Sequence, residues 1–192
     1  MSMAASRPLS KVSGPIGPLV VMGVSGCGKT SVGKLLASSL GYTFIEGDSR
    51  HSAANVEKMR KGIPLTDDDR WPWLETLGAE LAAGGETVIS CSALKRSYRD
   101  LLRNEAGRTI TFVFLQGTRT MLAARMSGRK GHYMPLSLLD SQLATLELPT
   151  SERDVVAIEI DQPLERIVSM AIARIASTAA CHGEQRIEWR KQ

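Results

Sequence analysis

The sequence predicts an α/β fold in which helices cover both faces of a five-stranded parallel sheet. Two observations carry this prediction. Short apolar runs alternate with segments of helical periodicity along most of the 192 residues, as in repeated strand–helix units. A glycine-rich turn joins the first apolar run to the first helical segment. The crossovers between parallel strands are expected to be right-handed, and ligands then bind beyond the carboxyl ends of the strands.

Each expected element has a local signal. Five short apolar runs are expected to form buried strands. They are residues 18–24, 42–48, 86–93, 109–117 and 154–161. Helical patterns fill the intervals between these runs and follow the last one. They cover residues 29–41, 52–62, 66–85, 94–107, 118–135, 136–149 and 163–177. The pattern over 118–135 breaks into a basic, glycine-punctuated stretch.

Some helix ends are marked by residue type. Gly41 is suited to end the first helix, because glycine readily adopts the left-handed conformation of a C-cap. Thr66 is suited to cap the third helix, and the three aspartates that follow it favour the positive end of the helix dipole. Pro163 falls near the first turn of the last helix, where proline is well tolerated.

Length and composition indicate one domain, expected over residues 18–177 with a small lid at about residues 125–135. Residues 1–17 are rich in Ser, Pro and Gly and are expected to form a flexible lead-in, and residues 178–192 a polar tail. The net charge of +4 is mild and suits an anionic small substrate. No basic stripe with interleaved aromatics is present, so no nucleic-acid partner is expected.

Cysteine usage and hydropathy indicate the compartment. The three cysteines, Cys27, Cys91 and Cys181, are far apart, which argues against a disulfide framework and for a reducing environment. They do not pair with histidines at zinc-site intervals. The chain has no apolar stretch long enough to span a membrane and no apolar signal-peptide core. We therefore expect a cytoplasmic protein with no membrane partner.

Residues 23–30, GVSGCGKT, fit the phosphate-binding pattern G-x-x-x-x-G-K-[ST]. The glycines let successive backbone N–H groups approach phosphate oxygens, and the following helix adds its positive end. Lys29 is expected to reach the β- and γ-phosphates, and Thr30 to supply an oxygen to Mg²⁺. The expected nucleotide-binding residues here are Gly23, Val24, Ser25, Gly26, Cys27, Gly28, Lys29, Thr30 and Ser31. Cys27 occupies a variable position and is interpreted as a small residue, not a nucleophile.

The rest of the chain decides which kind of phosphate-loop protein this is. The D-x-x-G and N-K-x-D segments of GTPases and the HRD and DFG elements of protein kinases are missing. The third strand does not end in aspartate as a usual Walker-B strand does. Asp48, after the second strand, is expected beside the phosphate loop, where it can serve Mg²⁺ and accept the proton of an attacking hydroxyl. Its alternative role is that of a helix N-cap.

The basic segment RMSGRKGHY, residues 125–133, is interpreted as a lid. Arg125, Arg129 and Lys130 surround glycines, and arginines on a closing flap can stabilise the charge of a phosphoryl group in transfer. The alternative is a solvated basic face.

Motifs spread over residues 18–175 resemble the gluconate kinase (gluconokinase) family, in the small shikimate-kinase-like branch. The more specific motifs are PLTDDDRWPWL and the pairing of CSALK with YRDLLR, and the others are EGDSRH, NVEKM, RKGHY, QLATLE and DQPLE. The resemblance implies phosphorylation of D-gluconate by ATP, with Mg²⁺, to give 6-phospho-D-gluconate. It also implies a homodimer and a P-loop kinase fold of the nucleoside-monophosphate-kinase type.

The resemblance also assigns roles by motif. Asp48 matches the family's acid after the second strand, and His51 its histidine in the same loop, on the sugar-acid side. Arg125 resembles the arginine that stacks on adenine, and Arg129 the lid arginine near the γ-phosphate. Gln162 and Pro163, in the DQP segment, resemble the loop that contacts adenine. His132, in RKGHY, joins the substrate-side candidates.

Gluconate carries a carboxylate, so its pocket needs a cation as well as fixed polar groups. Arg70, Lys95 and Arg99 are the candidates, although charged residues on amphipathic helices usually face solvent. The three aspartates at 67–69 are interpreted as helix-start residues, one of them a possible partner of a sugar hydroxyl. The substrate loop SRHSAAN lacks the basic residues expected between His51 and Asn55.

Two other interpretations stay open on the sequence alone. A kinase of another hydroxy acid, such as shikimate or another aldonic acid, would keep the phosphate loop, Asp48 and the lid. Shikimate kinases carry a glycine-rich segment after the third strand, where this chain has CSALK. A nucleotide-dependent switch without turnover would need neither Asp48 nor the lid arginines.

Overall fold

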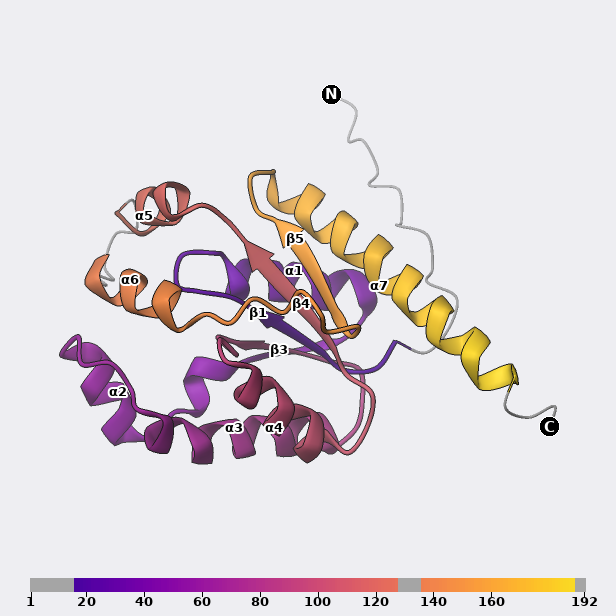
Figure 1. The fold of residues 1–192 in the computed structure, drawn as a ribbon, viewed down its shortest axis with the longest axis horizontal. Coiled ribbons are helices and arrows are strands. Elements are labelled where there is room, and N and C mark those ends of the chain that lie inside the picture. The colour runs from indigo at the N-terminus through magenta and orange to yellow at the C-terminus, as the bar shows by residue number, and fades with distance from the viewer. Residues whose placement is uncertain (1–15, 128–135, 189–192) are drawn as a thin grey trace, which may run out of the picture.

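Five parallel strands form a single sheet in the order β2-β3-β1-β4-β5 (Figure 1). The structure is a computed structural model that describes residues 16–127 and 136–188. The strands are β1 (Leu19–Met22), β2 (Thr43–Glu46), β3 (Thr87–Cys91), β4 (Thr111–Gln116) and β5 (Val155–Glu159). All neighbours pair in parallel, so the predicted five-stranded parallel sheet is confirmed.

Helices pack on both faces of the sheet. They are α1 (Lys29–Leu40), α2 (Ala53–Arg60), α3 (Asp67–Ala82), α4 (Arg96–Ala106), α5 (Arg119–Ser127), α6 (Leu136–Thr145) and α7 (Leu164–Glu188), with a 3₁₀ turn, η1 (Gly47–Arg50). Helices α1 and α7 cover one face, and α3 and α4 cover the other. Helices α2, α5 and α6 lie at the end of the sheet toward which the β1 arrow points (Figure 1).

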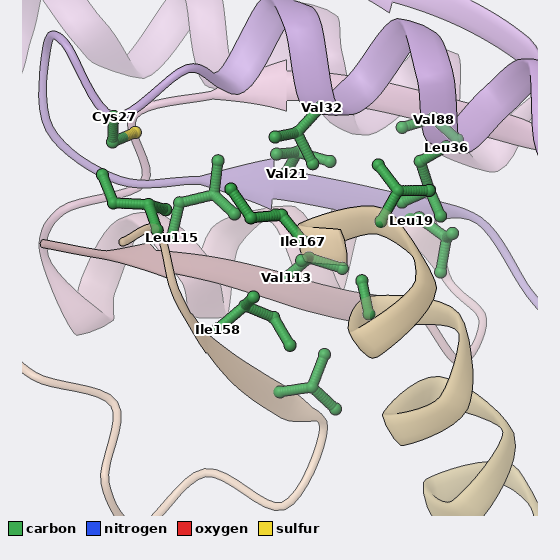
Figure 2. Packing of buried hydrophobic residues seen from close by; sticks show 14 of the residues in the cluster. Leu19, Val21, Cys27, Val32, Leu36, Val88, Val113, Leu115, Ile158 and Ile167 are labelled. Carbon is green, nitrogen blue, oxygen red and sulfur yellow. The ribbon is translucent and has the colours of Figure 1, made fainter. Parts of the chain in front are cut away.

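The core consists of one apolar layer on each face. Figure 2 shows the first layer, in which Val32 and Leu36 of α1 and Ile167 of α7 pack toward Val21 and Val113 of the central strands. The second layer lies under α3 and α4. Strand β1 is buried at every position, as expected for the centre of a sheet covered on both sides.

The strand order creates a crevice between β1 and β3. The chain leaves β1 through α1 on one face, and leaves β3 toward α4 on the other. Ligands of open α/β sheets bind at the carboxyl ends of two such strands. The loop that follows β1 contains the phosphate-binding sequence GVSGCGKT. The fold therefore places this loop at the crevice.

Several element boundaries differ from the sequence prediction, among them the ends of β2 and α7. The second strand ends at Glu46 instead of residue 48, and Gly47 begins the 3₁₀ turn η1. A Cβ at Gly47 would lie 2.0 Å from the carbonyl oxygen of Ser90, so a glycine is required where this turn passes β3. The last helix continues to Glu188 instead of ending at Ser177. Residues 178–188 contain no proline and several good helix formers, so polarity alone does not end the helix.

The predicted caps are confirmed. Gly41 ends α1 with φ 76°, a left-handed conformation that suits glycine. Thr66 accepts a hydrogen bond from the Asp69 N–H, and the Asp69 carboxylate accepts one from the Thr66 N–H, which together form a capping box. Asp69 thus has the helix-start role expected for one of the three aspartates. Within the described ranges, no helix is both long and apolar enough to cross a membrane.

Candidate active site

The phosphate-binding loop folds around its own lysine. Gly23, Gly26 and Gly28 have φ values of 140°, 83° and 95°, which non-glycine residues rarely adopt. The Lys29 ammonium donates hydrogen bonds to the carbonyl oxygens of Gly23 (3.1 Å) and Val24 (3.2 Å). The lysine therefore spans the loop from the first turn of α1, as a residue that receives phosphate oxygens should.

A second contact reaches the loop from α6. The Ser25 N–H donates to the Gln142 Oε1 at 2.6 Å, across 117 residues of sequence. The sequence assigned no role to Gln142, although the motif QLATLE that contains it contributed to the family resemblance. Only the folded chain brings this amide to the phosphate loop.

A cavity of about 430 Å³ adjoins the loop on the side of α1, α5 and the start of α7. Its lining includes Gly26, Gly28, Ser31, Arg125 and Gln162. The volume falls in the range of small-molecule sites. The predicted nucleotide residues Ser31, Arg125 and Gln162 therefore meet at one pocket.

Two other residues predicted to bind the nucleotide, Pro163 and Cys27, differ from these three in position or exposure. Pro163 is not among the lining residues of this cavity, and its carbonyl instead accepts from the Arg166 and Ile167 N–H groups to open α7. Cys27 lines the cavity but is buried, and burial raises the pKa of its thiol above the ordinary 9.0. A thiol that stays protonated agrees with its interpretation as a small residue of the loop.

Asp48 lies on η1, exposed, just beyond the carboxyl end of β2. The negative charge of Asp48 contributes an upward shift to the pKa of the His51 imidazole and to that of the Cys91 thiol. The positive charge of Lys29 contributes a downward shift to the pKa of the same thiol. The cap of α2 is Ser52, whose side chain accepts from the Asn55 N–H. Asp48 is therefore not used as the helix N-cap that its position after a strand also suggested.

His51 stacks on Trp73 with ring centroids 4.1 Å apart. Trp73 is held in turn, because its indole N–H donates to the Gly47 carbonyl at 2.8 Å. Burial lowers the pKa of His51 below its ordinary 6.5, against the opposing charge of Asp48. Its Nδ1 is buried and has no hydrogen-bond partner among the described residues, which marks it as a polar atom available to a ligand or water.

Arg70 and Lys95 both lie close to the ring of Tyr98. The Arg70 guanidinium is 5.9 Å and the Lys95 ammonium 5.5 Å from the centre of the Tyr98 ring. Lys95 pairs with the Asp67 carboxylate at 2.7 Å, and the Tyr98 hydroxyl donates to that carboxylate at 2.6 Å. Arg70 forms no ion pair within the part of the chain that the structure describes.

The prediction that Arg99 binds substrate is wrong. Its side chain is fully buried and its five N–H donors are all used within the protein. They bond to the Glu152 carboxylate and to three backbone carbonyls, those of Ala93, Leu94 and Glu147. A guanidinium with no free donor cannot also hold a gluconate carboxylate. Arg99 instead ties α4 to the chain before β5.

The remaining candidates are placed as follows. Arg129 and His132 lie outside the described residues. Thr30 lies in the first turn of α1 and is exposed. The described residues contain no group of three or more His, Cys, Asp or Glu side chains able to hold a metal ion. Magnesium in kinases is usually held by one or two protein groups plus phosphate oxygens, so Thr30 and Asp48 remain suitable for it.

Known proteins resemble this chain over most of its length. A family model described as an AAA domain matches residues 19–149. A gluconokinase of Gluconobacter oxydans (strain 621H) is 52% identical over 144 residues, 73% of this chain and 80% of that protein. The thermoresistant gluconokinase of Escherichia coli (strain K12) is 44% identical over 158 residues, 80% and 90% of the two chains. The crystal structure of a gluconokinase from Sinorhizobium meliloti 1021 has a TM-score of 0.84 at 54% identity and covers 88% of this chain and 97% of its own. The chain belongs to the gluconokinase family.

Proposed function

We propose that the protein transfers the γ-phosphoryl group of ATP to D-gluconate and forms 6-phospho-D-gluconate. The observation that carries this proposal is the juxtaposition, at one end of the sheet, of a phosphate loop, an exposed carboxylate and an acceptor-side cluster. That cluster consists of His51, Arg70, Trp73, Lys95 and Tyr98. It offers one unpaired cation and a buried, unpartnered ring nitrogen.

The nucleotide side fits ATP. The cavity beside the loop suits a purine nucleoside, and Arg125 on its wall is held by a hydrogen bond to the Ile160 carbonyl at 2.7 Å. The Lys29 ammonium uses two of its three N–H donors on the Gly23 and Val24 carbonyls, which leaves one for a phosphate oxygen. Thr30 and Asp48 would hold Mg²⁺, which when bound neutralises charge on the phosphate oxygens.

The acceptor side fits a sugar acid. Arg70 would receive the carboxylate of gluconate, since Lys95 is already paired with Asp67 and Arg99 is closed within the core. The neutral His51 would accept a sugar hydroxyl at Nδ1, the atom that now lacks a partner. A hydroxyl donor there satisfies a polar atom that is costly to leave unpaired.

Transfer then requires an in-line approach of the gluconate 6-hydroxyl oxygen to the γ-phosphorus. The new P–O bond forms while the bond to the bridging oxygen of ADP breaks, and the hydroxyl proton passes to the Asp48 carboxylate. In a loose transition state, orientation of the hydroxyl contributes at least as much as base strength. Arg129 in the proposed lid at 125–135 would stabilise the transferring group, and His132 would lie on the substrate side.

The assay that tests this function measures ADP release from ATP and Mg²⁺ with gluconate, other aldonic acids, shikimate and nucleoside monophosphates as acceptors. Turnover stimulated strongly by gluconate supports the proposal. Turnover with a different acceptor would retain the phosphoryl-transfer chemistry and reject the substrate. Tight ATP binding without any stimulated turnover would favour a nucleotide-dependent switch.

Two further properties are proposed on family membership. The protein is a homodimer, as the resemblance implies, and works in the cytoplasm, as its cysteine usage and hydropathy led us to expect. Light scattering coupled to size-exclusion chromatography would return twice the chain mass of 20.8 kDa for a dimer. A mass of one chain at micromolar concentration would reject it.

Replacement of Arg70 by methionine is expected to raise the KM for gluconate by roughly 10- to 150-fold, the value of a hydrogen bond to a charged group. Methionine keeps the apolar stem and removes the cation. The measurement compares gluconate with sorbitol, which has similar hydroxyls without a carboxylate. The preference for gluconate should fall in the variant.

Arg60→Met is the matched control, because Arg60 is an exposed cation on α2 that pairs with Glu57. It should leave the KM for gluconate unchanged. An Arg70→Met enzyme with a wild-type preference for gluconate over sorbitol would assign the carboxylate to another cation.

Replacement of Arg125 by alanine is expected to raise the KM for ATP by about 2- to 30-fold, the range of a cation–π contact. The KM for gluconate should stay within twofold, because Arg125 lies on the nucleotide cavity. The control is Arg119→Ala, at the other end of α5, where an exposed pair with Asp140 is lost. Equal effects of the two variants on ATP would point to a change in α5 instead of a nucleotide contact.

A further inference from the structure

One peptide unit of the phosphate loop is held at both of its polar ends. The carbonyl of Val24 accepts the Lys29 ammonium at 3.2 Å, and the N–H of the same peptide, on Ser25, donates to Gln142 Oε1 at 2.6 Å. In a trans peptide the C=O and N–H point in opposite directions. The lysine and the glutamine therefore lie on opposite sides of this peptide, and each contact favours the same orientation.

The segment that carries this peptide lies between two glycines. Gly23 and Gly26 flank Val24 and Ser25, and glycine has few steric limits on its dihedral angles, so contacts from outside the segment are needed to fix its path. If the peptide turned over, its carbonyl would leave Lys29 and its N–H would leave Gln142. Within the described residues, Gln142 is the one side chain that accepts a hydrogen bond from an amide of the 23–30 loop.

Helix α6 places Gln142 firmly. Leu139, one turn before it, is fully buried in the core layer that contains α1 and α7. The pair that Asp140 forms with Arg119 of α5, at 2.6 and 2.9 Å, is exposed and contributes little to the position of the helix. The burial of Leu139 therefore fixes the helix that presents the amide of Gln142 over the loop.

We propose that Gln142 is a positioning residue for phosphoryl transfer, which holds the Val24–Ser25 peptide in the orientation that places Lys29. The contact requires the side-chain oxygen of Gln142, because the group that it meets in the loop is the Ser25 N–H donor. The inference rests on the proposed kinase function for its effect on rate, but the contact to Ser25 is a property of the nucleotide-free protein. Displacement of a catalytic group by about 1 Å can lower the rate by about 100-fold.

The test compares Gln142→Met, which keeps the bulk and loses the acceptor, with Gln142→Glu, which keeps an acceptor oxygen and loses the amide donor. Met is expected to lower kcat with gluconate 10- to 100-fold and to leave the KM for gluconate within twofold. Glu is expected to retain kcat within threefold and to raise the KM for ATP, since it adds a negative charge near the phosphates.

A second measurement does not need turnover. In the nucleotide-free protein, the short bond should shift the Ser25 amide proton downfield in its NMR spectrum, and the shift should be lost in the Met variant and kept in the Glu variant. If wild-type protein does not phosphorylate gluconate, the proposed function fails while this amide signal still tests the contact.

Asp140→Ala is the matched control, because it removes the pair between α5 and α6 and leaves Gln142 in place. It should keep kcat within twofold. Near-wild-type kcat in Gln142→Met would overturn the proposal. Equal losses in Met and Glu would also overturn it, in favour of a direct contact between the amide nitrogen and substrate, and an equal loss in Asp140→Ala would assign the effect to helix docking.

Discussion

Asp48→Asn is expected to lower kcat with gluconate by about 10²- to 10⁴-fold, the range for loss of a general base. Asparagine has the same shape as aspartate but cannot take the hydroxyl proton. Asp48 is exposed on η1 and caps no helix, so the fold should not depend on it. Steady-state rates give kcat, and calorimetric titration with a non-hydrolysable ATP analogue shows whether nucleotide binding is retained.

The control for Asp48 is Glu75→Gln, an isosteric loss of charge at an exposed position of α3. It should leave kcat unchanged. Asp48→Glu separates position from basicity, since it keeps the carboxylate and moves it by one methylene. Near-normal kcat in Asp48→Asn would show that the carboxylate is not needed for transfer, and a switch function would regain support.

Glu152→Ala is expected to lower the free energy of unfolding by about 3–5 kcal/mol, the cost of breaking a buried ion pair by removing one partner. The Glu152 side chain is 6% exposed and bonds to Arg99, which is 1% exposed, and to Arg103. Its removal leaves the Arg99 charge uncompensated in the core. Urea denaturation followed by circular dichroism would measure the loss as a lower midpoint with an unchanged slope.

Glu57→Ala is the matched control, because it removes a carboxylate from an exposed pair on α2. Exposed pairs contribute little, so the urea midpoint should barely move. A Glu152→Ala midpoint equal to that of Glu57→Ala would mean that the buried network adds nothing to stability.

The same network predicts a pH dependence. Burial raises the pKa of the Glu152 carboxyl, but hydrogen bonds from Arg99 and Arg103 outweigh burial and the pKa lies below its ordinary 4.5. A depressed pKa in the folded protein means that the stabilisation is complete above about pH 4.5 and is lost as the pH falls through the folded pKa. In Glu152→Ala this part of the acid sensitivity should disappear.

The fold was predictable because its signals are local. Short apolar runs between segments of helical periodicity predicted all five strands. Gly41 and Thr66 marked helix ends that the structure confirms. The phosphate loop was predictable for the same reason, since its eight consecutive residues contain the whole pattern. The exact boundaries were less predictable, as at the end of β2, where the chain turns at Gly47 beside Ser90 of β3.

The candidate site was predictable only in part. Arg99 and Lys95 occupy the same helix start and look alike in sequence, yet Arg99 is buried in the core and Lys95 is partly exposed beside the Tyr98 ring. What separates them is the distant carboxylate that each meets, Glu152 or Asp67. The contact of Gln142 with Ser25 joins segments 117 residues apart, and no local pattern announces it.

The position of β1 at the centre of the sheet has a consequence for synthesis of the chain. Leu19 pairs with Val88 on one side and with Thr111 on the other. Strand β1, which leaves the ribosome before both of its neighbours, therefore acquires the second of them only after residue 111 has been made. Until then four apolar residues, LVVM, have no complete sheet around them. Such non-local pairing slows folding, and it makes the nascent chain depend on protection from aggregation while the centre of its sheet is still unfilled.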